Sequence, residues 1–537
     1  MDSQKFTDNP VFSSDSAYYI VIIVSFCVFI QFVTQVRGAR TFMYYDFMLN
    51  SGDSACLSIL MLLAKEPSHK AKRESISEKL GLTNYHLNKY LVIMNEDLAT
   101  VSENEPSFID ETTKGTFVGH NITTFINQKI YLLYLRRSNL FPAYEFRAFY
   151  DQQDIKISVY AREHFQTEST FYKNDRKLKK ELDDHDYYLI AGVNQDPEFI
   201  SRLRLFQFYY TTFTGIEKPL PQLNLISDEL CARLEGLFPG ELNPTQVVKL
   251  ETLLKVWILR QQNHRFIQSE LLDDNLRDRT YQTVYETLQD GLKDRLHIDT
   301  AEADYIFSFL LTQGFLGLND VQYVEHNFPT ATTISKKFVE MVLAKEVLTE
   351  RTDIHSTDLY NQLLSVNLQF TTFYVEPTTF ISPEQVTFFR DLYPTFDLII
   401  RDFLGALKHM ISFDLSERMI VNLYFSYMFC LINSIPTTSM KDRVFICVDF
   451  SEGQLYTNYV IKSLKAFNHA HIVIQKNITD DTDIYISDFH SMEVSAPQVI
   501  WLDPPTSQDW SELADLILEI KHRRLGQLFP NYKWQNG

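Results

Sequence analysis

The stretch ISVYAREHFQTESTFYKNDRKLKKEL, at residues 157–182, carries the most informative local pattern in the chain. Its spacing of apolar residues predicts a short helix over residues 158–164, followed by a two-residue turn that starts at Phe165. Thr167 is a good N-cap for a second helix that begins at Glu168, because an acid suits the positive end of the helix dipole. The stretch therefore predicts two helices joined by a tight turn.

The second of these helices has an apolar face and a basic face. Phe171, Leu178 and Leu182 recur at helical spacing, while residues 173–180 hold five basic side chains and one acid. A helix-turn-helix reads bases with polar groups at the start of its second helix and binds phosphates with cations along it. The alternative is an ordinary solvated helix face. The predicted DNA contacts are Thr167, Ser169, Thr170, Tyr172, Lys173, Arg176, Lys177 and Lys180.

A similar pattern lies upstream, in RESISEKLGLTNYHLNKYLVIMNEDL at residues 73–98. Gly81 supplies the turn and Thr83 the N-cap of the second helix. Residues 65–89 hold six basic and three acidic side chains, which gives local positive charge. The alternative is a plain helical hairpin with a solvated face. The predicted DNA contacts of this unit are Thr83, Asn84, Tyr85, His86, Asn88 and Lys89.

The whole chain is long and acidic. Its 537 residues exceed what one hydrophobic core supports, so we expect about three to five domains. Hydrophobic residues at 45% and charged residues at 22% are typical of a folded, largely helical protein. A net charge of −19 excludes a protein that coats nucleic acid over its whole surface. Any DNA contact must therefore be local.

Downstream of the two motifs, the pattern changes from helical to mixed. Repeated helical periodicity over residues 197–436 predicts two helical domains. Beyond them, alternating strand and helix patterns predict a small parallel sheet. The expected helices include 244–260, 276–296, 301–311, 334–347, 415–433, 455–466 and 510–522, and the expected strands are DRVFICVDF, HIVIQ, DIYISD and QVIWLD.

The first part of the chain, residues 1–48, contains an apolar stretch at 17–36 that is long enough to cross a bilayer. Aspartates precede it and arginines follow it, so a membrane anchor would leave the rest of the chain in the cytoplasm. The alternative is that translation begins at Met43 or Met48. Either interpretation predicts that the functional part is cytoplasmic.

LGLTNYHLNKYL and FQTESTFYKNDRKLKKEL resemble the two helix-turn-helix units of the Mga-type virulence regulators of Gram-positive bacteria. The resemblance also covers the order and size of the parts from about Met48 onward. It implies a global transcriptional activator that binds promoter DNA, forms a homodimer through its C-terminal region and contacts RNA polymerase. The implied domains are a winged helix-turn-helix at 49–115, a second helix-turn-helix at 116–196, helical phosphotransferase-system (PTS) regulation domains at 197–320 and 321–436, and an EIIB-like domain at 437–537.

The resemblance also implies histidines that are phosphorylated by the phosphocarrier protein HPr or a relative. Such a histidine needs an exposed, neutral imidazole. His264 is the leading candidate in the first regulation domain, because Arg260 and Arg265 flank it and could hold a phosphoryl group. His409 and then His355 are the candidates in the second. The alternative is that each is an ordinary surface or capping residue.

In the C-terminal domain, a working EIIB enzyme places a reactive Cys in the loop after its first strand. Here that loop is DFSEGQ, with Ser451 near the nucleophile position and Cys447 inside the strand. Asp449 and Glu452 would repel a phosphoryl group. We therefore expect dimerisation, rather than phosphotransfer, from this domain.

No pattern in the sequence predicts an enzyme, a cofactor or a metal site. The phosphate-loop, nucleophile-elbow, zinc-protease and C-x-x-C signatures are all missing. The five cysteines are scattered among apolar neighbours, which is typical of reduced core thiols in the cytosol. Two alternatives stay open: a component of the phosphotransferase system, and a DNA-binding regulator tethered to the membrane.

Overall fold

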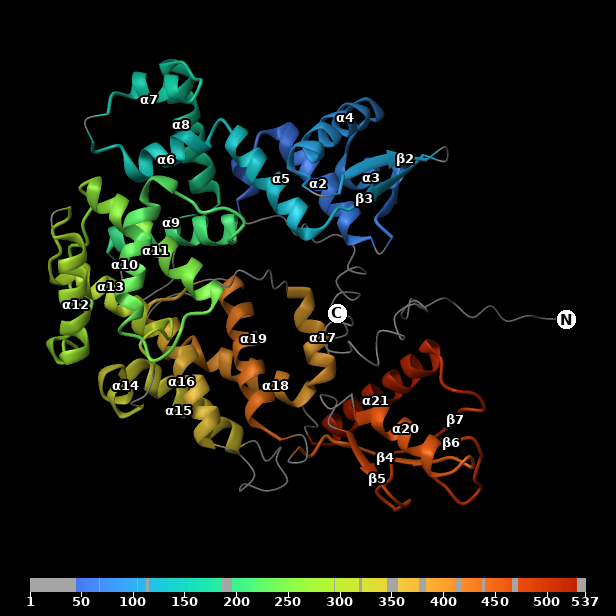
Figure 1. Cartoon of the computed structure of the whole chain (residues 1–537). Helices are drawn as coiled ribbons and strands as arrows, with labels where there is room; N and C mark the ends of the chain where they lie inside the picture. The colour runs from blue at the N-terminus through green and yellow to red at the C-terminus, as the bar shows by residue number, and fades with distance from the viewer. Residues whose placement is uncertain are drawn as a thin grey trace. The chain divides into compact units, whose positions relative to one another are not determined.

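The computed structural model describes residues 45–528, with gaps at 67, 104, 113–114, 154, 186, 188–195, 294, 318–320, 345–355, 376–382, 412–414, 416, 437–439 and 466–471. These residues are mainly helical, and a small parallel four-stranded sheet lies near the C-terminus (Figure 1). The predicted mainly helical fold with a C-terminal parallel sheet is therefore confirmed.

The chain divides into two lobes. The N-terminal lobe comprises the described residues of Gly38–Ala331 and Leu368–Phe380, and the C-terminal lobe those of Thr332–Asn367 and Ile381–Gly537. The helices α15 (Pro329–Ala344) and α16 (Ser356–Thr372) contribute to both lobes.

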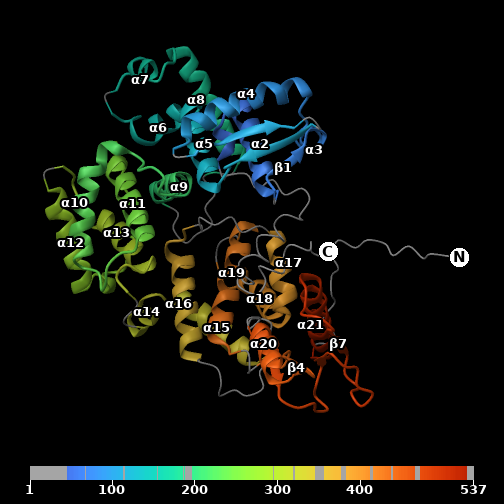
Figure 2. The same cartoon turned by 45° about the vertical axis from the view of Figure 1, so that its right-hand side comes forward.

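The first part of the N-terminal lobe combines helices with a three-stranded antiparallel sheet in the order β1-β3-β2. Figure 2 shows this sheet beside α2 and α3. The sheet pairs Ala71 with Phe117 and Ile109 with Gly119, which turns apolar side chains toward the helices. Its elements are the 3-10 turn η1 (Asp46–Met48), α2 (Ser51–Lys65), β1 (Lys70–Lys72), α3 (Arg73–Leu80), α4 (Asn84–Val101), β2 (Phe108–Glu111), β3 (Thr116–His120) and α5 (Thr124–Arg137).

Three shorter helices follow: α6 (Phe141–Phe149), α7 (Ile157–Glu163) and α8 (Glu168–Asp184). Aromatic side chains hold them together, since the ring of Phe146 lies 5.0 Å from that of Tyr160 and 5.5 Å from that of Phe171. The two helices that the opening motif predicts are confirmed here, with the turn between them at the expected place.

The rest of the N-terminal lobe is a helical bundle built around α11, whose residues from Leu250 to Gln261 are buried. Asn243 and Gln246 form a capping box that fixes the start of this helix. The bundle comprises α9 (Pro197–Phe213), η2 (Pro221–Leu223), α10 (Asn224–Glu235), α11 (Pro244–Gln262), η3 (Asp274–Leu276), α12 (Arg279–Leu292), α13 (Thr300–Thr312), α14 (Val321–Asn327) and the first turn of α15.

The predicted helices of this bundle are present, but their ends differ. The helix expected over 276–296 begins at Arg279, because the side chain of Asp278 accepts the N–H of Tyr281 at 3.0 Å and caps it there. The helix expected over 334–347 begins earlier, at Pro329, where proline suits the first turn.

The C-terminal lobe begins with helices that pack around aromatic side chains. The ring of Phe338 lies 4.7 Å from that of Phe403 and 4.9 Å from that of Tyr427. The buried carboxylate of Asp397 accepts the hydroxyl of Tyr424 at 2.9 Å. These helices are α15, α16, α17 (Pro383–Leu392), α18 (Pro394–Leu407) and α19 (Glu417–Ser434).

The parallel sheet has the strand order β5-β4-β6-β7. Ile446 in the central strand pairs with Ile474 on one side and Ile484 on the other, and Trp501 packs on Trp510 with ring centroids 5.0 Å apart. All four predicted strands are confirmed, although no helix separates β5 from β6 or β6 from β7. The elements are β4 (Val444–Asp449), α20 (Gln454–Lys465), β5 (Ile472–Gln475), β6 (Ile484–Ser487), β7 (Gln498–Ile500) and α21 (Ser507–Leu528).

The apolar stretch at 17–36 lies outside the described residues. Among the helices that the structure describes, none combines the length and the hydrophobicity needed to cross a bilayer.

Candidate nucleic-acid interface

The two predicted motifs share the same turn geometry. Gly81 and Phe165 both adopt the left-handed backbone region, at φ 65° and 56°. In each pair, the residue after the left-handed one, Leu82 or Gln166, donates its backbone N–H to the carbonyl five residues earlier, at 3.1 Å and 2.8 Å. Thr83 and Thr167 then cap α4 and α8 by accepting backbone N–H groups at 3.3 Å and 3.2 Å. The helix pairs α3–α4 and α7–α8 are therefore equivalent local structures.

The six predicted contact residues of the upstream pair lie at the exposed start of α4. Leu87 and Met94, on the opposite face, are fully buried. Asn88 accepts a hydrogen bond from Arg73 at 2.9 Å, and Arg73 is also paired with Glu111 of the neighbouring hairpin. The contact face of α4 is therefore polar, and its predicted contacts include one cation, Lys89.

The eight predicted contact residues of the downstream pair are also exposed, and they follow one face of α8. Phe171, Leu178 and Leu182 are buried, as expected. At about 100° of rotation per residue, Asp184 and four side chains before it fall within about 40° of the line opposite this buried face. These four lie upstream of the acidic last turn. They are Ser169, Lys173, Arg176 and Lys180. We call these four residues and Lys177 the basic face of α8.

The single acid within residues 173–180 is neutralised by an arginine of the neighbouring helix α6. Asp175 is paired with Arg147 of α6, and the Nη2 of Arg147 donates to it at 2.9 Å. Three acids, Glu181, Asp183 and Asp184, follow the block and end the positive surface at the C-terminus of the helix. The excess positive charge is therefore concentrated on residues 173–180, next to the hydroxyl groups of the first turn.

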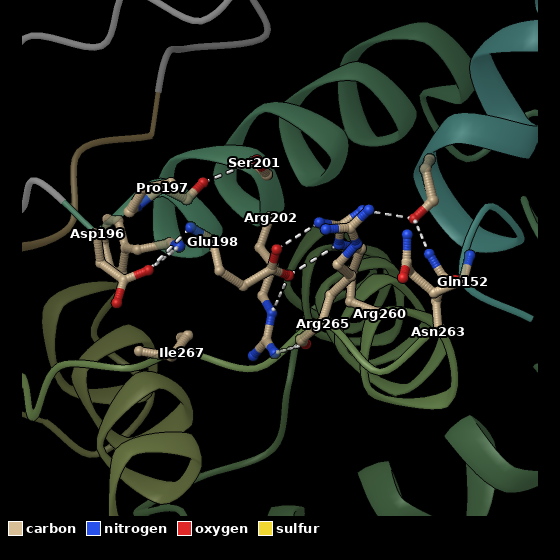
Figure 3. Close-up of polar contacts among 12 residues, drawn as sticks. Gln152, Asp196, Pro197, Glu198, Ser201, Arg202, Arg260, Asn263, Arg265 and Ile267 are labelled. Atoms are coloured by element: carbon tan, nitrogen blue, oxygen red, sulfur yellow. Dashed lines mark hydrogen bonds and ion pairs between the residues drawn. The ribbon is translucent and has the colours of Figure 1, made fainter.

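Polar contacts connect helices α6–α8, which we call the head, to the bundle built around α11. They are made by the turn at the end of α11 (Figure 3). Asn263 donates to the carboxylate of Asp151 at 2.8 Å and accepts the backbone N–H of Gln152 at 3.0 Å. Arg265 donates to the same aspartate at 2.6 Å, and Arg260 donates to the carbonyl of Ala148 at 2.6 Å. We call this set of contacts the α11 joint.

A buried ion network shares Arg260 with the joint, and apart from the i, i+4 pair Glu198–Arg202 on α9 its partners are too far apart in the sequence for local patterns to predict. Arg202 is fully buried and binds both oxygens of Glu302, at 2.6 Å and 2.8 Å, and Glu198 at 2.9 Å. Arg260 binds Glu198 at 2.8 Å, and the indole of Trp257 donates to Glu302 at 2.7 Å. The network ties α9, α11 and α13 together (Figure 3 shows its α9 and α11 members).

The leading phosphorylation candidate, His264, sits in the middle of the α11 joint. It is exposed and adopts φ 54° directly after the C-cap residue Asn263, which is a usual helix-ending conformation. Arg260 and Arg265, which we expected to hold a phosphoryl group, already have partners in this structure. Both guanidinium groups are bound instead to the carboxylates of Glu198 and Asp151.

The other two candidates are less informative. His409 is exposed in the turn that follows α18, where its backbone N–H donates to Ala406 at 3.0 Å. His355 lies outside the described residues.

The loop expected to correspond to the EIIB phosphate loop is occupied by a carboxylate of the chain itself. Asp488, which follows β6, accepts the backbone N–H of Ser451 at 2.9 Å and also its hydroxyl. Cys447 is buried in β4, and burial raises the pKa of its thiol. The loop amide and hydroxyl that could receive a phosphate are therefore already paired with an anion.

A scan against models of known protein families found no match, and a search of curated proteins found none either. Within the described part of the chain, no group of three or more His, Cys, Asp or Glu residues has a geometry that could hold a metal ion.

Proposed function

We propose that this protein is a sequence-specific, DNA-binding transcription regulator of the Mga type, and not an enzyme. The observation that carries the proposal is the basic face of α8, in a chain whose net charge is −19. A block of positive charge on a strongly acidic protein is typical of a surface that binds an anion such as the DNA phosphates. The turn before α8 and its Thr167 cap expose this helix in the way a helix-turn-helix exposes its recognition helix.

The two helix pairs act together on double-stranded promoter DNA. In this proposal α8 enters a major groove with Ser169, Thr170 and Tyr172 at the base edges and its cations on phosphates. The α3–α4 pair, with the β2–β3 hairpin as its wing, makes the second contact through the residues from Thr83 to Lys89. The activator role and the contact with RNA polymerase follow from the family resemblance.

Phosphorylation of His264 by HPr or a relative is the proposed control of the head. A phosphoryl group adds about −1.5 to −2 charges. At His264 this charge would lie on the residue between Asn263 and Arg265 in the chain and would weaken the contacts of both with Asp151, which hold helices α6–α8 to the bundle. The modification would therefore loosen the α11 joint. His409 and His355 remain candidates for a second control site.

The proposed homodimer forms through the C-terminal sheet. Loops that follow parallel strands all emerge at the carboxyl edge, and at this edge the chain exposes large apolar side chains that monomers normally cover. They are Leu455 at the start of α20, Phe489 and Met492 after β6, and Leu502 after β7, and we call these four residues the carboxyl-edge patch. The Ser451–Asp488 pairing disfavours the alternative, a phosphotransferase component.

The proposed location is the cytoplasm, because the described cysteines, Cys56, Cys231, Cys430 and Cys447, are buried free thiols of the kind that a reducing compartment preserves. Membrane tethering through the segment at 17–36 stays an alternative.

The proposal is tested by selecting duplexes that the full-length protein binds from a random-sequence pool. Binding of the selected duplex is then compared for the wild type and for a variant with Lys173→Ala, Arg176→Ala and Lys177→Ala. A matched control changes three exposed cations on and after α12, Arg279→Ala, Lys293→Ala and Arg295→Ala. We expect at least about a hundredfold loss for the α8 variant and little change for the control. Equal binding by the two variants, or no enrichment of any sequence, would contradict the proposal.

A further inference from the structure

The N-terminal lobe contains a cleft of about 720 Å³ that none of the proposed DNA or phosphorylation sites uses. Its walls come from the start of α9, the loop after the α11 joint, α13, the junction of α14 and α15, and the last turn of α16. A volume of this size is within the range, about 300–1,000 Å³, of clefts that hold small organic ligands.

The charged groups of the cleft have one sign. Three carboxylates line it, those of Asp196, Glu270 and Asp273, and no Lys, Arg or His is among its described lining residues. Burial alone would raise the pKa of Asp196, but the backbone N–H groups of Gln268, Phe199 and Glu198 hold this pKa below its usual value. This carboxylate is therefore ionised at neutral pH, and the cleft repels phosphorylated or carboxylate ligands.

The three carboxylates are not equally available. Asp196 already accepts four backbone N–H groups, and Glu270 is paired with Arg277 at 2.9 Å. Asp273 is exposed at the mouth of the cleft. It is therefore the carboxylate best placed to meet a cation that enters from solvent.

A second polar group in the cleft is left without a hydrogen-bond partner. The side-chain oxygen of Ser308, on α13, is buried and has no partner among the described residues. A buried hydroxyl without a partner costs about 1–3 kcal/mol, so such groups usually have a role. The rest of the wall includes Phe199, Leu272 and Leu276, which offer a surface for hydrocarbon.

From this combination we propose that the cleft binds a small aliphatic amine as an effector ligand. The ammonium group pairs with Asp273, a second amine N–H donates to the hydroxyl of Ser308, and the methylene groups pack on the apolar wall. The wall of the cleft is linked to the α11 joint by the short chain segment between Arg265 and Gln268. Arg265, whose carbonyl accepts from Arg202 at 2.8 Å, lies three residues before Gln268, whose N–H binds Asp196 in the cleft wall.

The test is titration calorimetry of the full-length protein with spermidine as the probe, and with xylitol and glucose 6-phosphate as neutral and anionic comparisons. We expect one saturable spermidine site and no saturable heat from the other two. Asp273→Asn should weaken spermidine binding about tenfold, because it removes a charge-assisted contact. Ser308→Ala should weaken it several-fold without lowering the melting temperature, since the hydroxyl has no partner to lose.

Asp290→Asn is the matched control, because it removes the same charge from an exposed site on α12 outside the cleft. Its affinity should equal that of the wild type. Equal weakening by Asp290→Asn and Asp273→Asn would mean diffuse attraction to an acidic protein, and would overturn the proposal. Tighter binding of xylitol or glucose 6-phosphate, or no saturable binding, would also overturn it. None of these results depends on DNA binding, so the regulator proposal stands or falls separately.

Discussion

Phe165 occupies a backbone position that glycine fills in the equivalent upstream turn. A bulky residue at φ 56° destabilises the fold by about 1–2 kcal/mol compared with glycine at the same position. The ring of Phe165 is fully exposed, so packing does not offset that cost. At Gly81 an added Cβ would meet nothing within 4 Å, so the cost of a side chain there comes only from the left-handed backbone conformation.

The two turns therefore predict opposite effects of opposite substitutions. Gly81→Ala should lower the free energy of unfolding by about 1 kcal/mol, and Phe165→Gly should raise it by up to about 1 kcal/mol. Denaturant titration of both variants checks this. Destabilisation by Phe165→Gly would show that the ring makes a contact that this structure does not contain.

Glu145 predicts a pH dependence. Burial raises the pKa of this carboxyl to about 7, although the hydroxyl of Tyr209 donates to it at 3.0 Å. The folded state thus holds a proton that the unfolded state releases near its ordinary pKa of about 4.3. Between these values stability should fall as pH rises, by at most about 1.4 kcal/mol per pH unit, and the loss should be complete above pH 7.

Glu145→Gln should remove this part of the pH dependence and should be more stable than the wild type above pH 7. Melting temperatures measured from pH 5 to pH 8 for both proteins check the difference. Parallel curves would mean that Glu145 is ionised in the folded protein across this range.

Residue types and helical spacing were enough to predict which side chains of the two motifs face solvent. All fourteen predicted contact residues are exposed, since an N-cap and a buried stripe fix the rotation of the following helix. The partners of Arg260 were not predictable in the same way. They come from α9 and from the end of α6, and local sequence carries no information on contacts at that separation.

At the scale of elements, the helices and strands that were predicted are present, and their errors fell at helix ends. A capping side chain such as Asp278 decides where a helix starts, and periodicity alone does not report it. The helices α5, α6, α9, α10, α14, α16, α17 and α18 were not among those predicted.

The buried ion network is the element-scale feature with the largest expected energy. Glu302→Gln would leave Arg202 and Trp257 facing a neutral amide, with the buried guanidinium short of one counter-charge. We expect a loss of about 3–5 kcal/mol in the free energy of unfolding. The exposed pair Arg233–Glu229 serves as the control, because Glu229→Gln should cost less than about 1 kcal/mol. Similar losses for the two variants would contradict the network's importance.

At the scale of the whole molecule, the carboxyl-edge patch predicts self-association. Met492→Glu, at a side chain that is 94% exposed, should raise the dimer dissociation constant about tenfold or more. Leu225→Glu, at 89% exposure on α10, is the matched control and should leave the dimer intact. Sedimentation velocity over a concentration series distinguishes them. A wild-type protein that stays monomeric over the whole concentration series would contradict the proposed dimer.

The domain boundaries were predicted in finer detail than the division of the chain that the structure shows. The chain divides into two lobes that share α15 and α16, and the five finer domains expected from residue 49 onward stay a prediction. A boundary that divides a helix leaves no linker in the sequence, and so composition could not reveal it.

The measurement that tests the central claim most directly is the salt dependence of DNA binding by the full-length protein, with and without the three α8 substitutions. If Lys173, Arg176 and Lys177 each neutralise a phosphate, the plot of log K against log salt should be about 2–3 units less steep for the variant. Identical slopes for the wild type and the variant would contradict the claim that α8 is the DNA-binding helix.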